Sequence, residues 1–96
     1  MLYHVRMDVR PPNDINPQRF ERLKAEEKAK AQELQRTGKW RHLWRIAGLY
    51  SNISIFDLDS HDELHAILSG PQLLPFMETT VAPLARHPSV IEESRR

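Results

Sequence analysis

Hydrophobic and polar residues alternate at the start of the chain, from residue 2 to residue 9. This two-residue period predicts a strand, because successive side chains of a strand point to opposite faces of a sheet. The run PPND at residues 11–14 ends it, since proline removes a backbone donor and Asn-Asp favours a turn. One face is expected to carry Tyr3, Val5, Met7 and Val9, and the other Leu2, His4, Arg6 and Asp8.

A helical pattern replaces the alternation over residues 17–37, which are rich in Glu, Lys, Gln, Ala and Leu. Asn16 is the expected N-cap, Pro17 suits the first helical position, and Gly38 suits the C-terminal end. The apolar stripe of this helix consists of Phe20, Leu23, Ala31 and Leu34.

Two adjacent strands are predicted at residues 40–47 and 50–57, joined by a tight turn at Gly48-Leu49. Neither face of the strand at residues 40–47 resembles ordinary solvated surface. In so small a protein it is expected to be covered on both sides, by the chain's own helices and by another subunit or a ligand. One face is expected to carry Trp40, His42, Trp44 and Ile46, and the other Arg41, Leu43, Arg45 and Ala47.

The last third of the chain predicts a second helix over residues 61–69 and a final strand over about 76–84. Ser60 is the expected N-cap, and Gly70-Pro71 stops the helix. The side chains expected to face inward are Leu64, Ile67 and Leu68.

The predicted order of elements is βαββαβ. This order is typical of an α+β ferredoxin-like fold, with an antiparallel four-stranded sheet and two helices. A single domain is expected over residues 1–96, in which residues 87–96 form a C-terminal tail without a periodic signal.

Composition narrows the class of protein. The 96 residues include 14 basic and 13 acidic side chains, and a net charge of +1 argues against nucleic-acid binding through bulk charge. The chain has no cysteine, which excludes disulfides, cysteine-ligated zinc and thiol catalysis. It has no apolar run as long as a signal peptide core or a membrane span, so a soluble, cytoplasmic protein is expected. A domain of this size buries little surface, which favours oligomerisation.

The apolar stripe of the first helix is interrupted at Glu27, where the helical spacing requires an apolar residue. A carboxylate on the core side is costly unless it is paired, protonated or next to a wet pocket. Desolvation would raise its pKa, which suits a base that deprotonates carbon. The alternative is a glutamate at the edge of the stripe, in a salt bridge with Lys24 or Lys28, and spacing alone favours that alternative.

The most distinctive run of the chain is WRHLWRIAG at residues 40–48, followed by Tyr50, Asn52 and the pair Phe56-Asp57. With MLYHVRM at the start, LKAEEK in the helix and RHPS near the end, this run resembles the muconolactone isomerase family over nearly the whole chain. The resemblance implies a cofactor-free and metal-free isomerase. Its reaction shifts the ring double bond of muconolactone to give 3-oxoadipate enol-lactone in bacterial catechol breakdown. It also implies a dimeric-barrel-type homo-oligomer, with ten subunits expected.

The resemblance assigns Glu27 as the proton shuttle, which reverses the preference from spacing alone. The lactone chemistry also requires hydrogen-bond donors and cations for the substrate's negative charges. If Gly48-Leu49 is a two-residue turn, Arg45 lies opposite Asn52, and both share a face with Tyr50 and Arg41. The candidates for contacts with the substrate are Lys28, Arg41, His42, Arg45, Tyr50 and Asn52.

Several alternatives stay open. The substrate could be a methyl- or chloro-substituted muconolactone, or the chain could be a non-catalytic ferredoxin-like oligomer that binds a small molecule. Arg41 and Arg45 could instead form ion pairs between subunits. Leu49 departs from family sequences that have a histidine there, which bears on substrate preference. The RHPS motif at residues 86–89 fits either a cover over a neighbour's pocket or a solvated tail.

Overall fold

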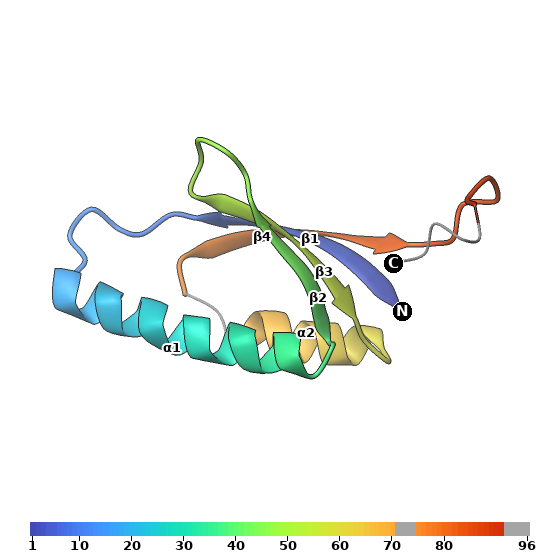
Figure 1. Cartoon of the computed structure of the whole chain (residues 1–96). Helices are drawn as coiled ribbons and strands as arrows, with labels where there is room; N and C mark the ends of the chain where they lie inside the picture. The colour runs from blue at the N-terminus through green and yellow to red at the C-terminus, as the bar shows by residue number, and fades with distance from the viewer. Residues whose placement is uncertain (71–74, 92–96) are drawn as a thin grey trace.

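The computed structural model describes residues 1–70 and 75–91, and its elements follow the order βαββαβ (Figure 1). The predicted α+β ferredoxin-like order is therefore confirmed. The expected stop at Pro71 and the last part of the tail, residues 92–96, lie outside the described residues. The elements are β1 (Leu2–Val9), α1 (Pro17–Arg36), β2 (Trp40–Arg45), β3 (Ser51–Asp57), α2 (His61–Ser69) and β4 (Met77–Leu84).

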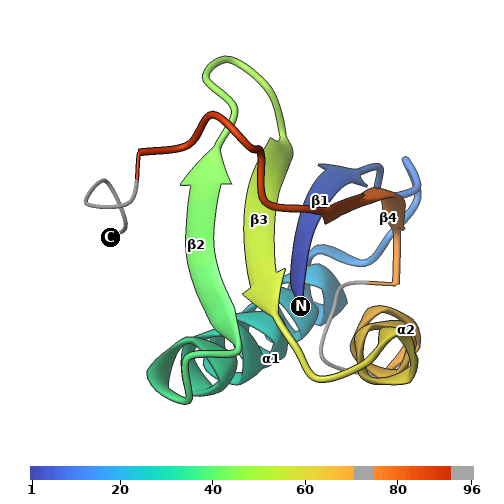
Figure 2. The same ribbon diagram turned by 90° about the vertical axis from the view of Figure 1, so that its right-hand side faces the viewer.

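The four strands form one antiparallel sheet in the order β2-β3-β1-β4. Both helices lie against the same face of this sheet (Figure 1, Figure 2). The molecule therefore has two layers, and its hydrophobic core lies between them. Neither described helix is long and apolar enough to cross a membrane.

Local sequence sets the ends of both helices as predicted. Asn16 caps α1 by accepting a hydrogen bond from the backbone nitrogen of Arg19 at 2.9 Å. Gly38 follows the end of α1 with a φ of 85°, a left-handed conformation that glycine adopts without a steric penalty. Ser60 caps α2 by accepting from the backbone nitrogen of Glu63 at 3.0 Å.

The core forms on the side of the sheet that faces the helices. The alternation of β1 directs its apolar residues inward, where they meet Ala31 of α1 and Leu64 and Ile67 of α2. Trp40 is 1% exposed, and its ring centroid lies 4.8 Å from that of Phe56. The remaining buried members of this core are Tyr3, Val5, Met7 and Leu58.

A β-bulge at the start of β2 overturns the predicted faces of that strand. Trp40 pairs with Phe56, but the next pair joins His42 to Ile55, so Arg41 is an extra residue that is opposite no residue of β3 in the strand register. The extra residue reverses the alternation after Trp40. The prediction that Trp40 shares a face with His42 and Trp44 is therefore wrong, as is the prediction that Arg41 follows the alternation of Arg45.

The turn between β2 and β3 also differs from the prediction. It is centred on Ala47 and Gly48 rather than on Gly48-Leu49, because the backbone nitrogen of Leu49 donates to the carbonyl of Ile46 at 3.1 Å. Gly48 has a φ of 84°, which only glycine adopts readily in a turn. Both strands are shorter than predicted at this turn. β2 ends at Arg45 rather than at residue 47, and β3 begins at Ser51 rather than at residue 50. The predicted pairing of Arg45 with Asn52 is confirmed.

The face of the sheet opposite the helices has no cover from the described chain (Figure 1). The rings of His42 and Trp44 stack on it, with centroids 4.9 Å apart and an angle of 7° between their planes. Trp44 is 54% exposed, so this face of the sheet presents a large apolar side chain to its surroundings. By strand register the same face also carries Leu2, Ile53, Ile55, Ala82 and Leu84.

Candidate active site

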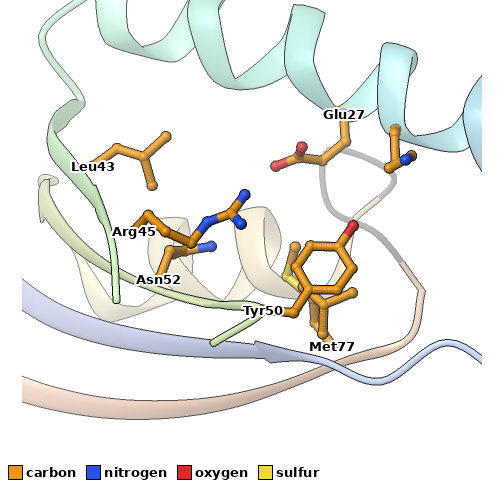
Figure 3. A pocket seen from close by; sticks show the side chains of 8 residues that line it. Glu27, Leu43, Arg45, Tyr50, Asn52 and Met77 are labelled. Carbon is orange, nitrogen blue, oxygen red and sulfur yellow. The ribbon is translucent and has the colours of Figure 1, made fainter. Parts of the chain in front are cut away.

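A cavity of about 300 Å³ lies between α1 and the sheet (Figure 3). It is closed on one side by the helix and on the other by the strands, so its walls combine segments that are distant in the sequence. The residues that line it are Val9, Lys24, Glu27, Leu43, Arg45, Tyr50, Asn52 and Met77.

The helical wall carries the charged side chains Lys24 and Glu27. They are three residues apart in α1, and this spacing places them on the same side of the helix. That side also carries the half-buried Leu23 and the buried Ala31, so it is the side that faces the sheet. The interruption of the apolar stripe at Glu27 thus coincides with the cavity.

Glu27 is half-buried, and its carboxylate points into the cavity (Figure 3). Burial raises the pKa of this carboxyl above its usual value. Among the described residues, no ammonium or guanidinium nitrogen lies within 4.0 Å of it, and the ammonium nitrogen of Lys24 instead lies 2.8 Å from a carboxylate oxygen of Glu21. The salt bridge from Glu27 to Lys24 or Lys28, the alternative open from the sequence, is not formed.

Arg45 of β2 lies on the opposite wall and extends toward Glu27 (Figure 3). Its guanidinium carbon is 5.5 Å from the ring centroid of Tyr50, a cation–π distance that orients the side chain. Among the described residues, Arg45 has no carboxylate partner within 4.0 Å, so its charge is available to an anion in the cavity.

Asn52 and Tyr50 supply neutral polar groups beside Arg45. The Oδ1 atom of Asn52 accepts a hydrogen bond from the buried hydroxyl of Ser54 at 3.1 Å, which fixes the amide. The amide nitrogen is turned toward the cavity, and the Tyr50 hydroxyl points toward α1 (Figure 3). Both groups can therefore donate hydrogen bonds to a bound molecule.

Three of the candidates from the sequence lie outside this cavity. Lys28 is exposed and, as the residue after Glu27, is turned about 100° around the helix. Arg41 occupies the bulge, and its guanidinium nitrogen Nη1 lies 3.6 Å from the carboxylate oxygen Oδ2 of Asp57. His42 stacks on Trp44 on the opposite face of the sheet. The structure therefore brings Glu27, Arg45, Tyr50 and Asn52 together and leaves these three apart.

Four of the residues that line the cavity have no predicted role in the site, and these are Val9, Lys24, Leu43 and Met77. Lys24 could have been found, because it precedes Glu27 by one helical turn on the same side. Leu43 depends on the bulge, and Met77 comes from β4 at the far edge of the sheet. Their placement follows from tertiary packing rather than from any local pattern.

Acid–base chemistry is what these side chains offer. Within residues 1–70 and 75–91, no group of three His, Cys, Asp or Glu side chains is placed to hold a metal ion. A half-buried carboxylate opposite an arginine without an acidic partner is suited to proton transfer on an anionic small molecule. The fold and cavity thus define a ferredoxin-like domain with an acid–base site.

Comparison with known proteins identifies the family. Residues 1–90 match the family model described as muconolactone delta-isomerase. The chain is 55% identical to a muconolactone delta-isomerase of Pseudomonas aeruginosa over 96 residues, which is the full length of both proteins. It is 53% identical over 91 residues to a muconolactone delta-isomerase of Rhodococcus opacus, covering 95% of this chain and 98% of the relative.

A solved structure agrees with this assignment. The crystal structure of a muconolactone isomerase superposes with a TM-score of 0.89 at 52% sequence identity, covering 96% of each chain. The chain belongs to the muconolactone delta-isomerase family, as its sequence resemblance indicates.

Proposed function

We propose that this protein isomerises muconolactone to 3-oxoadipate enol-lactone, the reaction of the beta-ketoadipate pathway that its relatives' names and its resemblance indicate. The observation that carries the proposal is the position of Glu27. Its carboxylate faces a cavity of about 300 Å³, is partly desolvated, and has Arg45 on the opposite wall.

Glu27 acts as both base and acid in the proposed mechanism. The carboxylate removes the proton from the γ-carbon of the lactone ring, and the electron pair of that C–H bond moves through the conjugated ring to the carbonyl oxygen. The resulting dienolate then takes the same proton from Glu27 at the α-carbon. Both carbons lie on one face of the ring, so one carboxylate can reach each in turn.

The other polar residues of the cavity bind the charged parts of the substrate. Arg45 presents a planar set of donors that fits the carboxylate of the acetate arm. Asn52 and Tyr50 donate hydrogen bonds near the reacting ring, where negative charge accumulates in the dienolate. Their positions are fixed before the substrate arrives, by Ser54 in the case of Asn52 and by Arg45 in the case of Tyr50.

The direct test is an ultraviolet assay of the purified protein with muconolactone, without added metal or cofactor. We expect isomerisation at an enzymatic rate. Absence of turnover on muconolactone, together with turnover of a methyl- or chloro-substituted analogue, would transfer the proposal to the substituted lactone. The apolar side chains of Val9, Leu43 and Met77 in the cavity are compatible with such a substituent. Binding of the lactones without any turnover would favour the non-catalytic alternative.

Chelation of metal ions is expected to leave this turnover unchanged. In the proposed mechanism Glu27 moves the proton, and fixed donors stabilise the developing charge, so no Lewis acid is required. The measurement is the isomerisation rate before and after incubation with EDTA and desalting. Loss of the rate after EDTA, with recovery on addition of a divalent metal, would contradict the mechanism.

A homo-oligomer larger than a dimer, with ten subunits expected, is the proposed assembly. The sheet face without helices exposes Trp44, and beyond β4 the chain exposes Val90 and Ile91, at 46% and 62%. Apolar surface of this kind is usually covered by another subunit. Light scattering should therefore give a mass many times the 11.3 kDa of one chain. A monomer at micromolar concentration would contradict this proposal. Such an assembly is proposed to work in the cytoplasm.

A further inference from the structure

Lys24 is a second cation on the wall of the cavity, and the proposed mechanism has not yet used it. It is half-buried and lies on the same side of α1 as Glu27, one helical turn earlier. Its ammonium nitrogen is 2.8 Å from a carboxylate oxygen of Glu21 and 4.8 Å from the ring centroid of Phe20. Phe20 and Glu21 are thus neighbours of the ammonium group along α1, and Glu21 is exposed, whereas Lys24 itself lines the cavity.

Tyr50 connects Lys24 to the rest of the site. The ion pair with Glu21 is the main reason that the pKa of Lys24 is raised, and the proximity of Tyr50 adds to it, whereas burial acts in the opposite direction. The Tyr50 hydroxyl points toward α1 (Figure 3). A cation and a hydroxyl donor thus face the same part of the cavity, on the helical side, while Arg45 occupies the strand side.

This arrangement matches the distribution of charge in the reaction. In muconolactone the carbonyl oxygen and the acetate arm leave the ring at the two carbons that flank the ring oxygen, so they diverge. The acetate arm is negatively charged throughout, whereas the carbonyl oxygen becomes negative only in the dienolate. Two separate cations are therefore useful, one at each end, with the base between them.

We propose that Lys24 is a further catalytic residue, which contacts the lactone carbonyl oxygen beside the Tyr50 hydroxyl and stabilises the dienolate, while Arg45 binds the acetate arm. A compact ammonium group suits a single oxygen, and the planar guanidinium suits a carboxylate. Lys24 stays protonated throughout and exchanges no proton, so Glu27 remains the only group that transfers one. This proposal rests on the proposed isomerase function.

The competing explanation is that Lys24 only forms a surface ion pair with Glu21 that supports the helix. Two control variants separate these roles. Lys30→Gln removes a lysine of the same helix that has an i,i+3 ion pair with Glu33, at 4.0 Å, but does not line the cavity. Glu21→Gln breaks the ion pair of Lys24 while keeping its positive charge at the cavity.

The experiment compares kcat, KM and melting temperature of these two controls with Lys24→Gln and Lys24→Arg, using muconolactone. We expect Lys24→Gln to lower kcat by about 10²-fold, as loss of one oxyanion donor does, with a much smaller change in KM. The kcat of Lys24→Arg should be at least tenfold higher than that of Lys24→Gln, because arginine restores the positive charge. Lys30→Gln and Glu21→Gln should keep most of the wild-type kcat.

Two results would overturn the assignment of Lys24 while leaving the isomerase function in place. One is a kcat of Lys24→Gln close to that of Lys30→Gln. The other is an equal loss of kcat in Lys24→Gln and Glu21→Gln, together with similar falls in melting temperature. That result would show that the ion pair between Lys24 and Glu21 supports the helix. A wild-type protein inactive on muconolactone would instead refute the proposed function, and the role of Lys24 with it.

Discussion

Glu27→Gln is expected to lower kcat by about 10²–10⁴-fold without loss of the fold. Glutamine has the same shape as glutamate but cannot accept the γ-proton, so the variant loses the base and keeps the cavity. The effect should appear in kcat and in kcat/KM alike, because the proton transfer occurs only after the substrate is bound. This is the largest loss of kcat that we expect from any single substitution in the cavity.

The matched control is Glu26→Gln, which removes a carboxylate at the preceding, exposed position of α1 that does not line the cavity. It should retain nearly the wild-type kcat. Turnover of Glu27→Gln within a few-fold of wild type would eliminate Glu27 as the proton shuttle and leave Tyr50 as the next candidate. The melting temperature of both variants, measured alongside, distinguishes a lost base from a lost structure.

The pH dependence follows from the same carboxyl. Burial raises the pKa of Glu27, and only the ionised form accepts a proton. We therefore expect kcat/KM to rise with pH through the raised pKa and then to level off, a limb that should be absent in Glu27→Gln. Because the folded-state pKa exceeds the unfolded value, ionisation of Glu27 opposes folding as pH rises through this interval. At neutral pH the glutamine variant should melt at the same or a higher temperature.

Arg45→Ala is expected to weaken substrate capture by about ten- to a hundredfold, which corresponds to about 1.5–3 kcal/mol for a charge-assisted contact. Arg45 has no acidic partner among the described residues, so its removal breaks no ion pair of the folded chain. The loss should therefore appear mainly in KM, with a small change in melting temperature. Steady-state kinetics over a range of muconolactone concentrations, with thermal denaturation, gives both quantities.

Arg41→Ala provides the comparison, because the sequence alone could not choose between the two arginines. Arg41 lies 3.6 Å from Asp57 and is outside the cavity, so its loss should leave KM close to the wild-type value. A larger KM effect at Arg41 than at Arg45 would show that the acetate arm binds elsewhere. In that case the assignment of the cavity walls would have to be revised.

The sequence was sufficient for the elements of the fold. Strict alternation located β1, and the capping residues Asn16 and Ser60 located the starts of both helices. These signals are local, since each depends on a few neighbouring residues and on the geometry of a single element. The orientation of Glu27 was predictable for the same reason, because a polar residue within an apolar stripe has to face the interior side of its helix.

The remaining parts of the site depend on interactions that no local pattern encodes. The bulge at Arg41 lies next to the contact between the Trp40 and Phe56 rings, which joins two strands. The turn lies one residue earlier than predicted, and Gly48 takes the left-handed position within it. Met77 reaches the cavity only through the pairing of β4 with β1. Lys28, a predicted substrate contact, is outside the cavity, whereas Lys24 lines it from the same side of α1 as Glu27.

The bulge in β2 has a consequence for how this site is specified. Trp40 points toward the helices, and an unbroken strand would then turn His42 and Trp44 toward the helices as well, and Arg45 away from them. One additional residue inverts the phase of the strand, so that Arg45 faces Glu27 and Trp44 faces outward. The register shift between Trp40 and His42 therefore decides that Arg45, and not Trp44, is on the side of the strand that faces the cavity.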